Sequence, residues 1–375
     1  MKIGIPRETA PGERRVAIIP ETVKKLAAKK IESVVETGAG LASSFSDAEY
    51  QQAGALIASS FDDVVAKSDA IVKVVRPDDG ELARLKEGTA LVCLQYPLSS
   101  ADFVRAAAAK KLMTVALDMI PRTTLAQAMD VLSSQANLAG YWAVVAAATR
   151  LPKIFPMLMT AAGTITPSRV LIMGVGVAGL QAIGTAKRLG AVVEATDVRP
   201  ETKEQVESLG GRFLMVQGVE YKQGTGGYAA EQSDEYKKAQ AAMVSAAIAK
   251  ADVVITTALI PGRKAPVLVT EEQVKSMRAG SVIVDLASEQ GGNVAGSVAG
   301  KDVVLHGVTV IGGRSVPSNV AFHASQAFSR NIEKLLLHIT ADGNWKIDLN
   351  EEITKGCVIT KEGEIVHAKV KETIK

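Results

Sequence analysis

The chain has 375 residues, of which 47% are hydrophobic, so it is long enough to bury two or three sizeable cores. Its 43 basic and 40 acidic side chains are interspersed and leave a formal charge of +3, which excludes the basic stripe that nucleic acid would require. Two distant cysteines, Cys93 and Cys357, exclude a disulfide framework and are typical of a reducing, cytoplasmic compartment.

Short β-branched runs alternate with helix-forming segments over the first third of the chain. The expected strands read KIGIP, ESVVETG, AIVKVV, ALVCL and MTVALDM, and segments such as ETVKKLAAKK and SADFVRAAAAKK are the helices between them. This alternation predicts a parallel sheet with helices on both faces. A second series, RVLIMG, VVEATD, DVVITTA, SVIVDLA and VTVIGG, predicts a second sheet of the same kind.

A long apolar segment, residues 125–150, separates the two series, and its Ala, Leu and Met content favours a helix. Four polar side chains stand out at its start. Arg122 lies in the loop before it, and Gln127, Asp130 and Ser133 are spaced three apart on one helical face. None of the four is a good general base or nucleophile, so we expect them to orient and polarise a ligand.

A structural interpretation competes for one member of this polar cluster. Thr124 and Gln127 fit a capping box, in which the Gln127 side chain returns to a free amide of the first helical turn. That interpretation explains neither Asp130 nor Ser133.

The sharpest motif lies in VLIMGVGVAGLQAIGTAKRLGAVVEATDVRP. Gly174, Gly176 and Gly179 follow an apolar strand and open a helix, the pattern of a dinucleotide-binding turn. Gly174 would permit the tight turn, Gly176 would leave room for a pyrophosphate, and Gly179 would let the helix pack closely on the strand. The first free amides of the helix, at Val177 and Ala178, would bind the phosphates.

Asp197 ends the next strand, where its carboxylate can accept hydrogen bonds from both ribose hydroxyls of the adenosine half. Because Asp197 would repel a 2′-phosphate, NAD(H) is favoured over NADP(H). Val198 and Arg199 complete this region of the expected cofactor-binding set. Arg199 could weaken the preference for NAD(H), although a solvated charge at the strand end is the simpler interpretation.

Cofactor crevices in such folds lie at the carboxyl ends of the strands. Ala258 and Leu259 follow one strand, and Glu289 to Gly291 follow the next, so we expect them to flank the nicotinamide half. Ordinary strand-to-helix turns are the alternative. Residues 217–237 are rich in Gly, Tyr and charge and predict a long surface loop, either a structureless insertion or a lid with Tyr228 at its centre.

The last segment of the chain predicts a long amphipathic helix over residues 318–340 and a β-rich tail that we expect to return to the first sheet. The expected fold class is α/β, two doubly wound Rossmann-like domains with parallel sheets joined by two long helices. Residues 1–133 plus 323–375 would form the first domain, and residues 134–322 the NAD(H)-binding domain. The four histidines lack ligand spacing, so no metal is expected, and the longest apolar stretches fall short of the roughly 20 residues of a membrane span.

Several stretches together resemble one known family: KIGIPRETAPGERRVAIIPETV, MIPRTTLAQAMDVLSSQ, FPMLMTAAGTITPSRVLIMGVGVAGLQAIGTAKRLGAVVEATDVR and ITTALIPGRKAPVLVTEE. They are similar to the NAD(H)-binding component of proton-translocating nicotinamide nucleotide transhydrogenases, which are relatives of alanine dehydrogenase. The resemblance covers nearly the whole chain. It implies direct hydride transfer between NAD(H) on this chain and NADP(H) on a partner subunit, which needs positioning but no proton transfer at the reacting carbons.

The resemblance also implies roles for individual residues. Arg122 would contact the nicotinamide carboxamide, while Gln127, Asp130 and Ser133 would fix the ring and bridge to the partner. The loop around Tyr228 would close over bound NAD(H).

The implied partners are NADP(H)-binding and membrane-spanning transhydrogenase subunits, together with a second copy of the chain in a homodimer. The chain would be cytoplasmic and peripheral on the cytoplasmic face of the bacterial inner membrane. One departure is visible, because the family usually has a second basic residue where this chain has Leu125.

An amino-acid oxidoreductase like alanine dehydrogenase is the rival, since it shares the fold, the glycine-rich turn and the arginine matched here by Arg15. Oxidative deamination needs proton transfers and a water attack. The relative uses a lysine and a histidine at the positions where this chain has Val75 and then Gln95 and Tyr96, and Lys73 makes a weak substitute. A non-catalytic NAD-binding protein is a third alternative.

Overall fold

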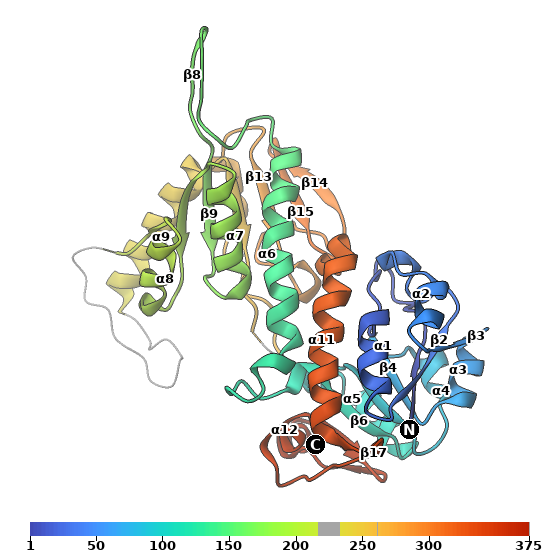
Figure 1. Ribbon diagram of the computed structural model, residues 1–375. Coiled ribbons are helices and arrows are strands. Elements are labelled where there is room, and N and C mark those ends of the chain that lie inside the picture. Colours follow the sequence, from blue (N-terminus) through green and yellow to red (C-terminus); the bar gives the residue numbers. More distant parts are fainter. Residues whose placement is uncertain (217–232, 261, 375) are drawn as a thin grey trace. The chain divides into compact units, whose positions relative to one another are not determined.

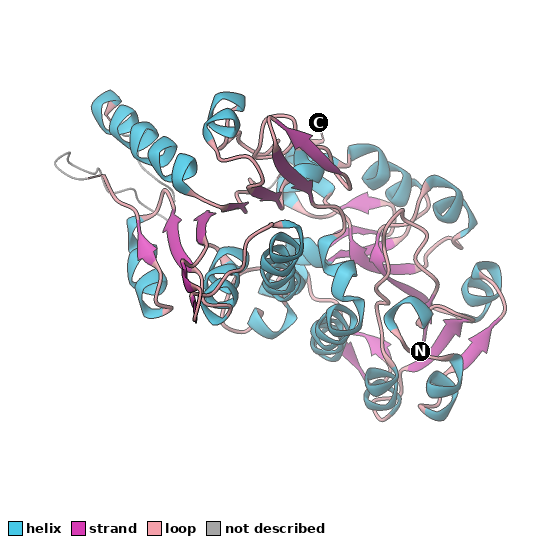
Figure 2. Cartoon of the chain, turned by 90° about the horizontal axis from the view of Figure 1, so that it is seen from above, coloured by secondary structure: helices cyan, strands magenta, loops and turns pink. Residues whose placement is uncertain are grey.

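The computed structural model describes residues 1–216, 233–260 and 262–374 (Figure 1). The chain divides into two compact units, one of Met1–Gln135 with Pro317–Lys375 and the other of Ala136–Val316. Each unit is built on a large, mainly parallel sheet with helices packed around it (Figure 2). This architecture confirms the expected α/β fold class.

The first unit contains an eight-stranded sheet. Six strands are parallel, and the C-terminal β18 adds antiparallel to β6, so the tail returns to the first sheet as expected. Across the sheet the strands are β19 (Glu364–Ile365), β18 (Val358–Lys361), β6 (Met113–Ala116), β5 (Ala90–Leu94), β4 (Ala70–Val75), β1 (Lys2–Ile5), β2 (Glu32–Glu36) and β3 (Leu56–Ala58).

Both faces of this sheet are buried, because neighbouring residues of a strand point to opposite faces. In β5, Val92 packs into one apolar cluster while Leu91 and Cys93 pack into the other. The helices of the unit are α1 (Pro20–Ala27), α2 (Asp47–Gln52), α3 (Phe61–Lys67), α4 (Asp79–Arg84), α5 (Ala101–Ala109), α11 (Ala321–Ile339), α12 (Glu352–Cys357) and α13 (Ala368–Thr373), beside a small β16 (Thr340–Ala341) and β17 (Asn344–Trp345) ribbon.

The second unit contains a seven-stranded sheet with only β14 antiparallel. The strand order reverses direction between β9 and β12, the kind of switch point where nucleotides bind in doubly wound folds. Across the sheet the strands are β11 (Arg212–Phe213), β10 (Val192–Thr196), β9 (Arg169–Met173), β12 (Val253–Thr256), β13 (Val282–Asp285), β15 (Val308–Gly312) and β14 (Asp302–Leu305).

The helices of the second unit are α7 (Val177–Arg188), α8 (Lys203–Ser208), α9 (Asp234–Lys250) and α10 (Glu271–Ser276). The loop expected over residues 217–237 is shorter than predicted, because α9 already begins at Asp234. A hairpin of β7 (Leu158–Thr160) and β8 (Gly163–Ile165) projects from this unit (Figure 1).

The two long expected helices are α6 (Val131–Arg150) and α11. Helix α6 carries the chain from the first unit into the second, and the chain returns through the 3-10 segment η7 (Val316–Val320). In α11, the buried hydroxyls of Ser325 and Ser329 accept the backbone N–H groups of Val16 and Ile19 at 3.0 Å each. Among the described residues, every helix is too short or too polar to span a bilayer.

Candidate functional site

The glycine-rich turn joins β9 to α7, and its three glycines have different surroundings. Gly174 has a φ of +101°, and a Cβ there would lie 2.5 Å from Oγ1 of Thr257. A Cβ on Gly179 would lie 2.0 Å from the carbonyl oxygen of Gly174, so the helix packs directly on the turn. A Cβ on Gly176 would meet nothing within 4 Å, which leaves open space where a pyrophosphate could approach the backbone.

Helix α7 begins directly after Gly176, with Val177 and Ala178 in its first turn. The first amides of an α-helix have no acceptor within the helix, and the helix dipole adds a partial positive charge there. The N-terminus of α7 therefore offers the phosphate-binding groups that the motif predicts, beside the open space over Gly176.

Asp197 follows β10 directly, and each oxygen of its carboxylate accepts two hydrogen bonds. Oδ2 accepts from the backbone N–H of Val175 at 2.7 Å and from Nη2 of Arg199 at 3.1 Å. Oδ1 accepts from the backbone N–H and from Nε of Arg199, both at 2.9 Å. Burial raises the pKa of Asp197, but these bonds outweigh it and the pKa lies below its usual value. The carboxylate is therefore ionised beside the glycine-rich turn.

The loop after β12 is tied to the same turn. Thr257 donates its backbone N–H to the carbonyl oxygen of Met173 at 3.0 Å and its hydroxyl to that of Gly174 at 3.0 Å. The next residue, Ala258, is held by Asn293, whose Oδ1 accepts the Ala258 N–H at 3.0 Å. Ala258 thus lies at the carboxyl edge of the sheet, one residue from the contact with the glycine-rich turn.

A buried pair behind this loop fixes its position. Asn293 and Asp285 are both fully buried, and Oδ2 of Asp285 accepts the backbone N–H of Asn293 at 3.0 Å. Sequence reasoning missed Thr257, Asp285 and Asn293. A signal existed, since Asp285 ends an apolar strand and Asn293 lies in the polar stretch that follows it.

The remaining expected nicotinamide-side residues are exposed. Leu259 has 48% of its surface accessible. Glu289 lies in the 3-10 turn η6 (Ser288–Gln290), and its Oε2 accepts the backbone N–H of Ser315 at 2.9 Å. Val198 is also exposed, at 61%. Tyr228 lies outside the described residues.

The polar cluster belongs to the first unit and departs from the expected geometry. Helix α6 starts only at Val131, and Gln127 lies in a separate 3-10 turn, η4 (Gln127–Met129). The expected capping box with Thr124 is therefore wrong, and Gln127 does not share a helical face with Asp130 and Ser133.

The physical reason is that Asp130 caps α6. Its Oδ1 accepts the backbone N–H of Ser133 at 2.9 Å, and its Oδ2 accepts the Ser133 hydroxyl at 2.6 Å. An aspartate is a strong N-cap, so the helix begins after Asp130. Arg122 and Gln127 are exposed, and neither side chain has a hydrogen-bond partner among the described residues. Both are free to contact a ligand or a partner.

Lys73 is buried and engaged rather than free. It is 1% exposed, and its Nζ lies 2.9 and 2.8 Å from the two carboxylate oxygens of Glu81 and 3.9 Å from Glu8. Gln95 is fully buried, and Arg15 is bound through its guanidinium to Glu13. The case for Lys73 as an acid–base catalyst stays weak, because its ammonium group is neutralised by carboxylates inside the core.

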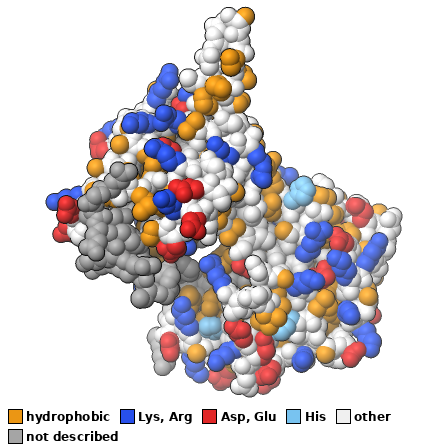
Figure 3. Space-filling model, turned by 60° about the vertical axis from the view of Figure 1, so that its left-hand side comes forward, with side chains coloured by type: hydrophobic (Ala, Val, Ile, Leu, Met, Phe, Trp, Pro, Cys, Tyr) orange, Lys and Arg blue, Asp and Glu red, His pale blue; other side chains and the backbone are white. Residues whose placement is uncertain are grey.

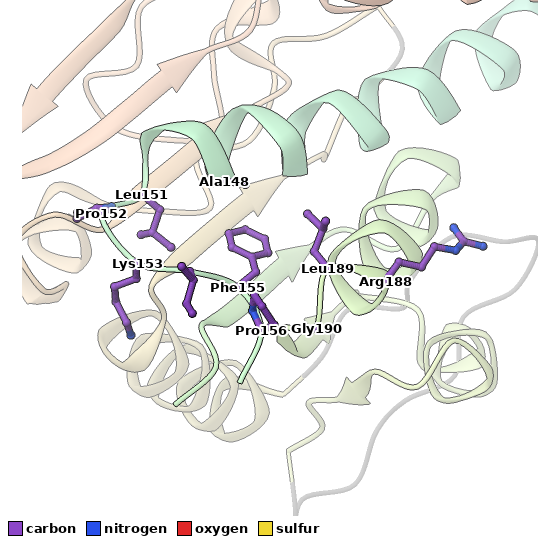
Figure 4. A pocket seen from close by; sticks show the side chains of 10 residues that line it. Ala148, Leu151, Pro152, Lys153, Phe155, Pro156, Arg188, Leu189 and Gly190 are labelled. Carbon is purple, nitrogen blue, oxygen red and sulfur yellow. The ribbon is translucent and has the colours of Figure 1, made fainter. Parts of the chain in front are cut away.

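A surface pocket of about 730 Å³ lies at the opposite end of α7 (Figure 4). Phe155, Pro156 and Leu189 line it together with Gly190, whose φ of +87° ends the helix. Because the free amides of α7 are at its other end, this pocket is separate from the glycine-rich turn. The described residues contain no group of three His, Cys, Asp or Glu side chains arranged to hold a metal ion.

Two family models match the chain, one after the other. The model of the alanine dehydrogenase/PNT N-terminal domain matches residues 4–139, and that of the alanine dehydrogenase/PNT C-terminal domain matches residues 143–368.

Individual proteins are similar over the whole length. The chain is 50% identical over 376 residues to the first section of NAD(P) transhydrogenase subunit alpha from Rhodospirillum rubrum, with 98% of each chain covered. A solved transhydrogenase structure from Sinorhizobium meliloti is 44% identical, with 98% of this chain and 100% of that chain covered and a TM-score of 0.89. A solved L-alanine dehydrogenase is 25% identical, with 100% and 99% covered and a TM-score of 0.82.

Proposed function

Because the chain belongs to the alanine dehydrogenase/PNT family, we propose that it is the NAD(H)-binding subunit of a proton-translocating transhydrogenase. Hydride passes directly between NAD(H) on this chain and NADP(H) on a partner subunit, and a membrane-spanning subunit couples the transfer to proton movement. The observation that carries the proposal is the near full-length similarity to a chain named as NAD(P) transhydrogenase subunit alpha.

The geometry of the second unit supports NAD(H) as the bound nucleotide. The pyrophosphate would lie over Gly176 against the first amides of α7, and Asp197 would accept the adenosine ribose hydroxyls. The ionised carboxylate would repel a 2′-phosphate and so favour NAD(H) over NADP(H). Ala258, Leu259 and Glu289 would flank the nicotinamide half, and Tyr228 would belong to the loop that closes over it.

The polar cluster of the first unit supports a positioning role. Arg122 would contact the carboxamide, and Gln127 the ring and the partner nucleotide, because both side chains are exposed and free. Asp130 and Ser133 would complete the ring contact from the first turn of α6. Hydride transfer between two nicotinamides requires no proton transfer at the reacting carbons, so residues that only orient are sufficient.

Alanine dehydrogenase activity is less well supported. Lys73 is bound to both oxygens of Glu81, and the place of the relative's histidine is taken by the buried Gln95 and by Tyr96. No side chain found at these positions is available to transfer protons to an amino acid. A non-catalytic NAD-binding protein would share the glycine-rich turn but would not need the free Arg122 and Gln127.

We also propose that two copies associate through the β7–β8 hairpin. Every residue of both strands is exposed, and residues 157–166 have no charged side chain (Figure 3). Met157 and Met159 are 57% and 79% accessible. An isolated two-stranded hairpin is marginal in water, and uncharged edge strands pair with other chains. A second copy would cover this surface in a two-fold dimer.

The proposed complex lies on the cytoplasmic face of the bacterial inner membrane, where membrane-spanning partner subunits hold this chain. The decisive experiment is the reduction of an NAD analogue by NADPH, followed spectroscopically. Activity is expected only when the purified chain is mixed with an NADP(H)-binding transhydrogenase component. Intact NADH binding without activity in the mixture would overturn the proposal and favour a non-catalytic NAD-binding protein.

A further inference from the structure

The carboxylate of Asp197 is already saturated with hydrogen bonds. A carboxylate offers about four lone-pair positions, and Asp197 uses all four, through one bond from Val175 and three from Arg199. A ribose with two free hydroxyls needs acceptors at this same carboxylate. At least some of the present bonds must therefore be released before the ribose can bind in the expected way.

The four bonds differ in how easily they can be released. Two come from backbone N–H groups, of Val175 in the glycine-rich turn and of Arg199 at the strand end, and releasing them would require the backbone to move. The other two come from Nε and Nη2 of the Arg199 side chain, which is 39% exposed, whereas the Asp197 side chain is only 6% exposed. Arg199 can rotate into solvent, and Asp197 cannot.

We propose that Arg199 is a displaceable latch on the ribose-binding carboxylate, which occupies the place of the ribose hydroxyls until the nucleotide displaces its guanidinium. The inference rests on the proposed NAD(H) site and names the residue that regulates its affinity. The latch keeps Asp197 ionised and correctly oriented in the empty site. It also makes each binding event break a bidentate ion pair, which weakens affinity and favours rapid exchange of nucleotide.

The latch also bears on nucleotide choice. The backbone N–H of Arg199 binds Asp197, so a displaced guanidinium stays within one side-chain length of the ribose-binding carboxylate. A 2′-phosphate accepts hydrogen bonds from a guanidinium, whereas the diol of NADH gains no charge-assisted bond from it. Arg199 therefore competes with NADH for Asp197 while reducing the penalty against NADPH.

The test compares binding of ADP-ribose, NADH and NADPH to the wild-type chain, Arg199→Gln and Arg199→Lys, with Arg278→Gln as a control for loss of an exposed arginine from the same unit. We expect Arg199→Gln to bind ADP-ribose and NADH about two- to fivefold more tightly, in line with the small contribution of partly exposed ion pairs. Arg199→Lys should fall between, because lysine cannot form the bidentate pair. Selectivity for NADH over NADPH should rise in Arg199→Gln.

Salt provides a second readout that a merely structural ion pair would not give. Raising the ionic strength screens the Arg199–Asp197 pair, so the affinity advantage of Arg199→Gln over wild type should shrink. Equal or weaker binding by a folded Arg199→Gln would overturn the latch while leaving the proposed function intact. Absence of NADH binding by the wild-type chain would overturn both, and tight binding without hydride transfer would overturn the proposed function alone.

Discussion

Asn293 holds Ala258 by both polar groups of its backbone. Its Oδ1 accepts the Ala258 N–H at 3.0 Å, and its Nδ2 donates to the Ala258 carbonyl oxygen at 2.9 Å. Because Asn293 is itself fully buried and bound to Asp285, the loop after β12 is fixed from inside the sheet edge. A single amide side chain thus positions the loop expected to meet the nicotinamide half.

We expect Asn293→Ala to lower both stability and NADH affinity. The change leaves buried polar groups without partners, at a cost of about 1–3 kcal/mol in the free energy of unfolding. Urea unfolding and NADH titration would measure the two effects, with the exposed Asn344→Ala as control. An unchanged NADH dissociation constant in a destabilised variant would mean that the loop after β12 does not contact the nucleotide.

A second prediction concerns Gln127, which is exposed and has no side-chain partner among the described residues. Gln127→Asn shortens the side chain by one methylene and should leave NADH affinity within a few-fold. Hydride transfer should slow by about a hundredfold, because a misplacement near 1 Å at the reacting groups has this effect. Stopped-flow transfer with the partner component measures it, with Gln52→Asn as the exposed control. Equal losses of affinity and rate would indicate that Gln127 contributes only to binding.

The glycine-rich turn could be predicted from sequence because its geometry is local. Gly174 needs a positive φ, and Gly179 packs against the turn only a few residues before it in the chain. Neighbouring residues alone set these requirements, so the spacing of the glycines reveals them.

The start of α6 and the buried polar contacts could not be predicted in the same way. Both Thr124 and Asp130 are plausible N-caps in the sequence, and tertiary packing selects Asp130. The contact of Asn293 with Ala258 spans 35 residues. Periodicity says nothing about such a pair, because it reports which face a residue lies on and not which distant backbone group it meets.

Asp130 allows a structural role to be separated from a functional one. Asp130→Ala removes the cap of α6 and should destabilise the first unit by about 1 kcal/mol. Asp130→Asn should retain stability, since asparagine caps helices as well as aspartate does. Thermal unfolding and hydride-transfer rates of both variants decide the matter. Normal transfer by a stable Asp130→Asn would show that the charge of Asp130 is needed for neither role.

The hairpin predicts how the chain associates. Met159→Asp places a charge on an uncharged edge, which should weaken self-association without unfolding the monomer, because Met159 is 79% exposed. Sedimentation over a range of concentrations would show a shift from dimer to monomer. Val304→Asp, at another exposed strand position with 70% accessibility, is the matched control. A wild-type chain that stays monomeric, or a dimer that tolerates both changes equally, would contradict the hairpin interface.

The last prediction concerns the buried Glu8 of the first unit. Its Oε1 accepts the backbone N–H of Val74 at 2.6 Å, and Lys73 lies 3.9 Å away. Burial nevertheless raises the pKa of Glu8 from 4.5 to about 7. Between these values the folded chain keeps a proton that the unfolded chain has released, so Glu8 makes stability fall as pH rises through this window.

Glu8→Gln should flatten that dependence, because the amide has nearly the same shape and does not titrate. Urea midpoints at pH 5, 6, 7 and 8 should fall less steeply with pH for Glu8→Gln than for wild type, and the exposed Glu32→Gln should follow wild type. Above the raised pKa the wild-type chain carries the cost of a buried carboxylate that the amide avoids, so the stability of Glu8→Gln relative to wild type should be greatest there. Parallel curves for all three chains would mean that Glu8 stays ionised across this range, with Lys73 and the backbone amides offsetting its burial.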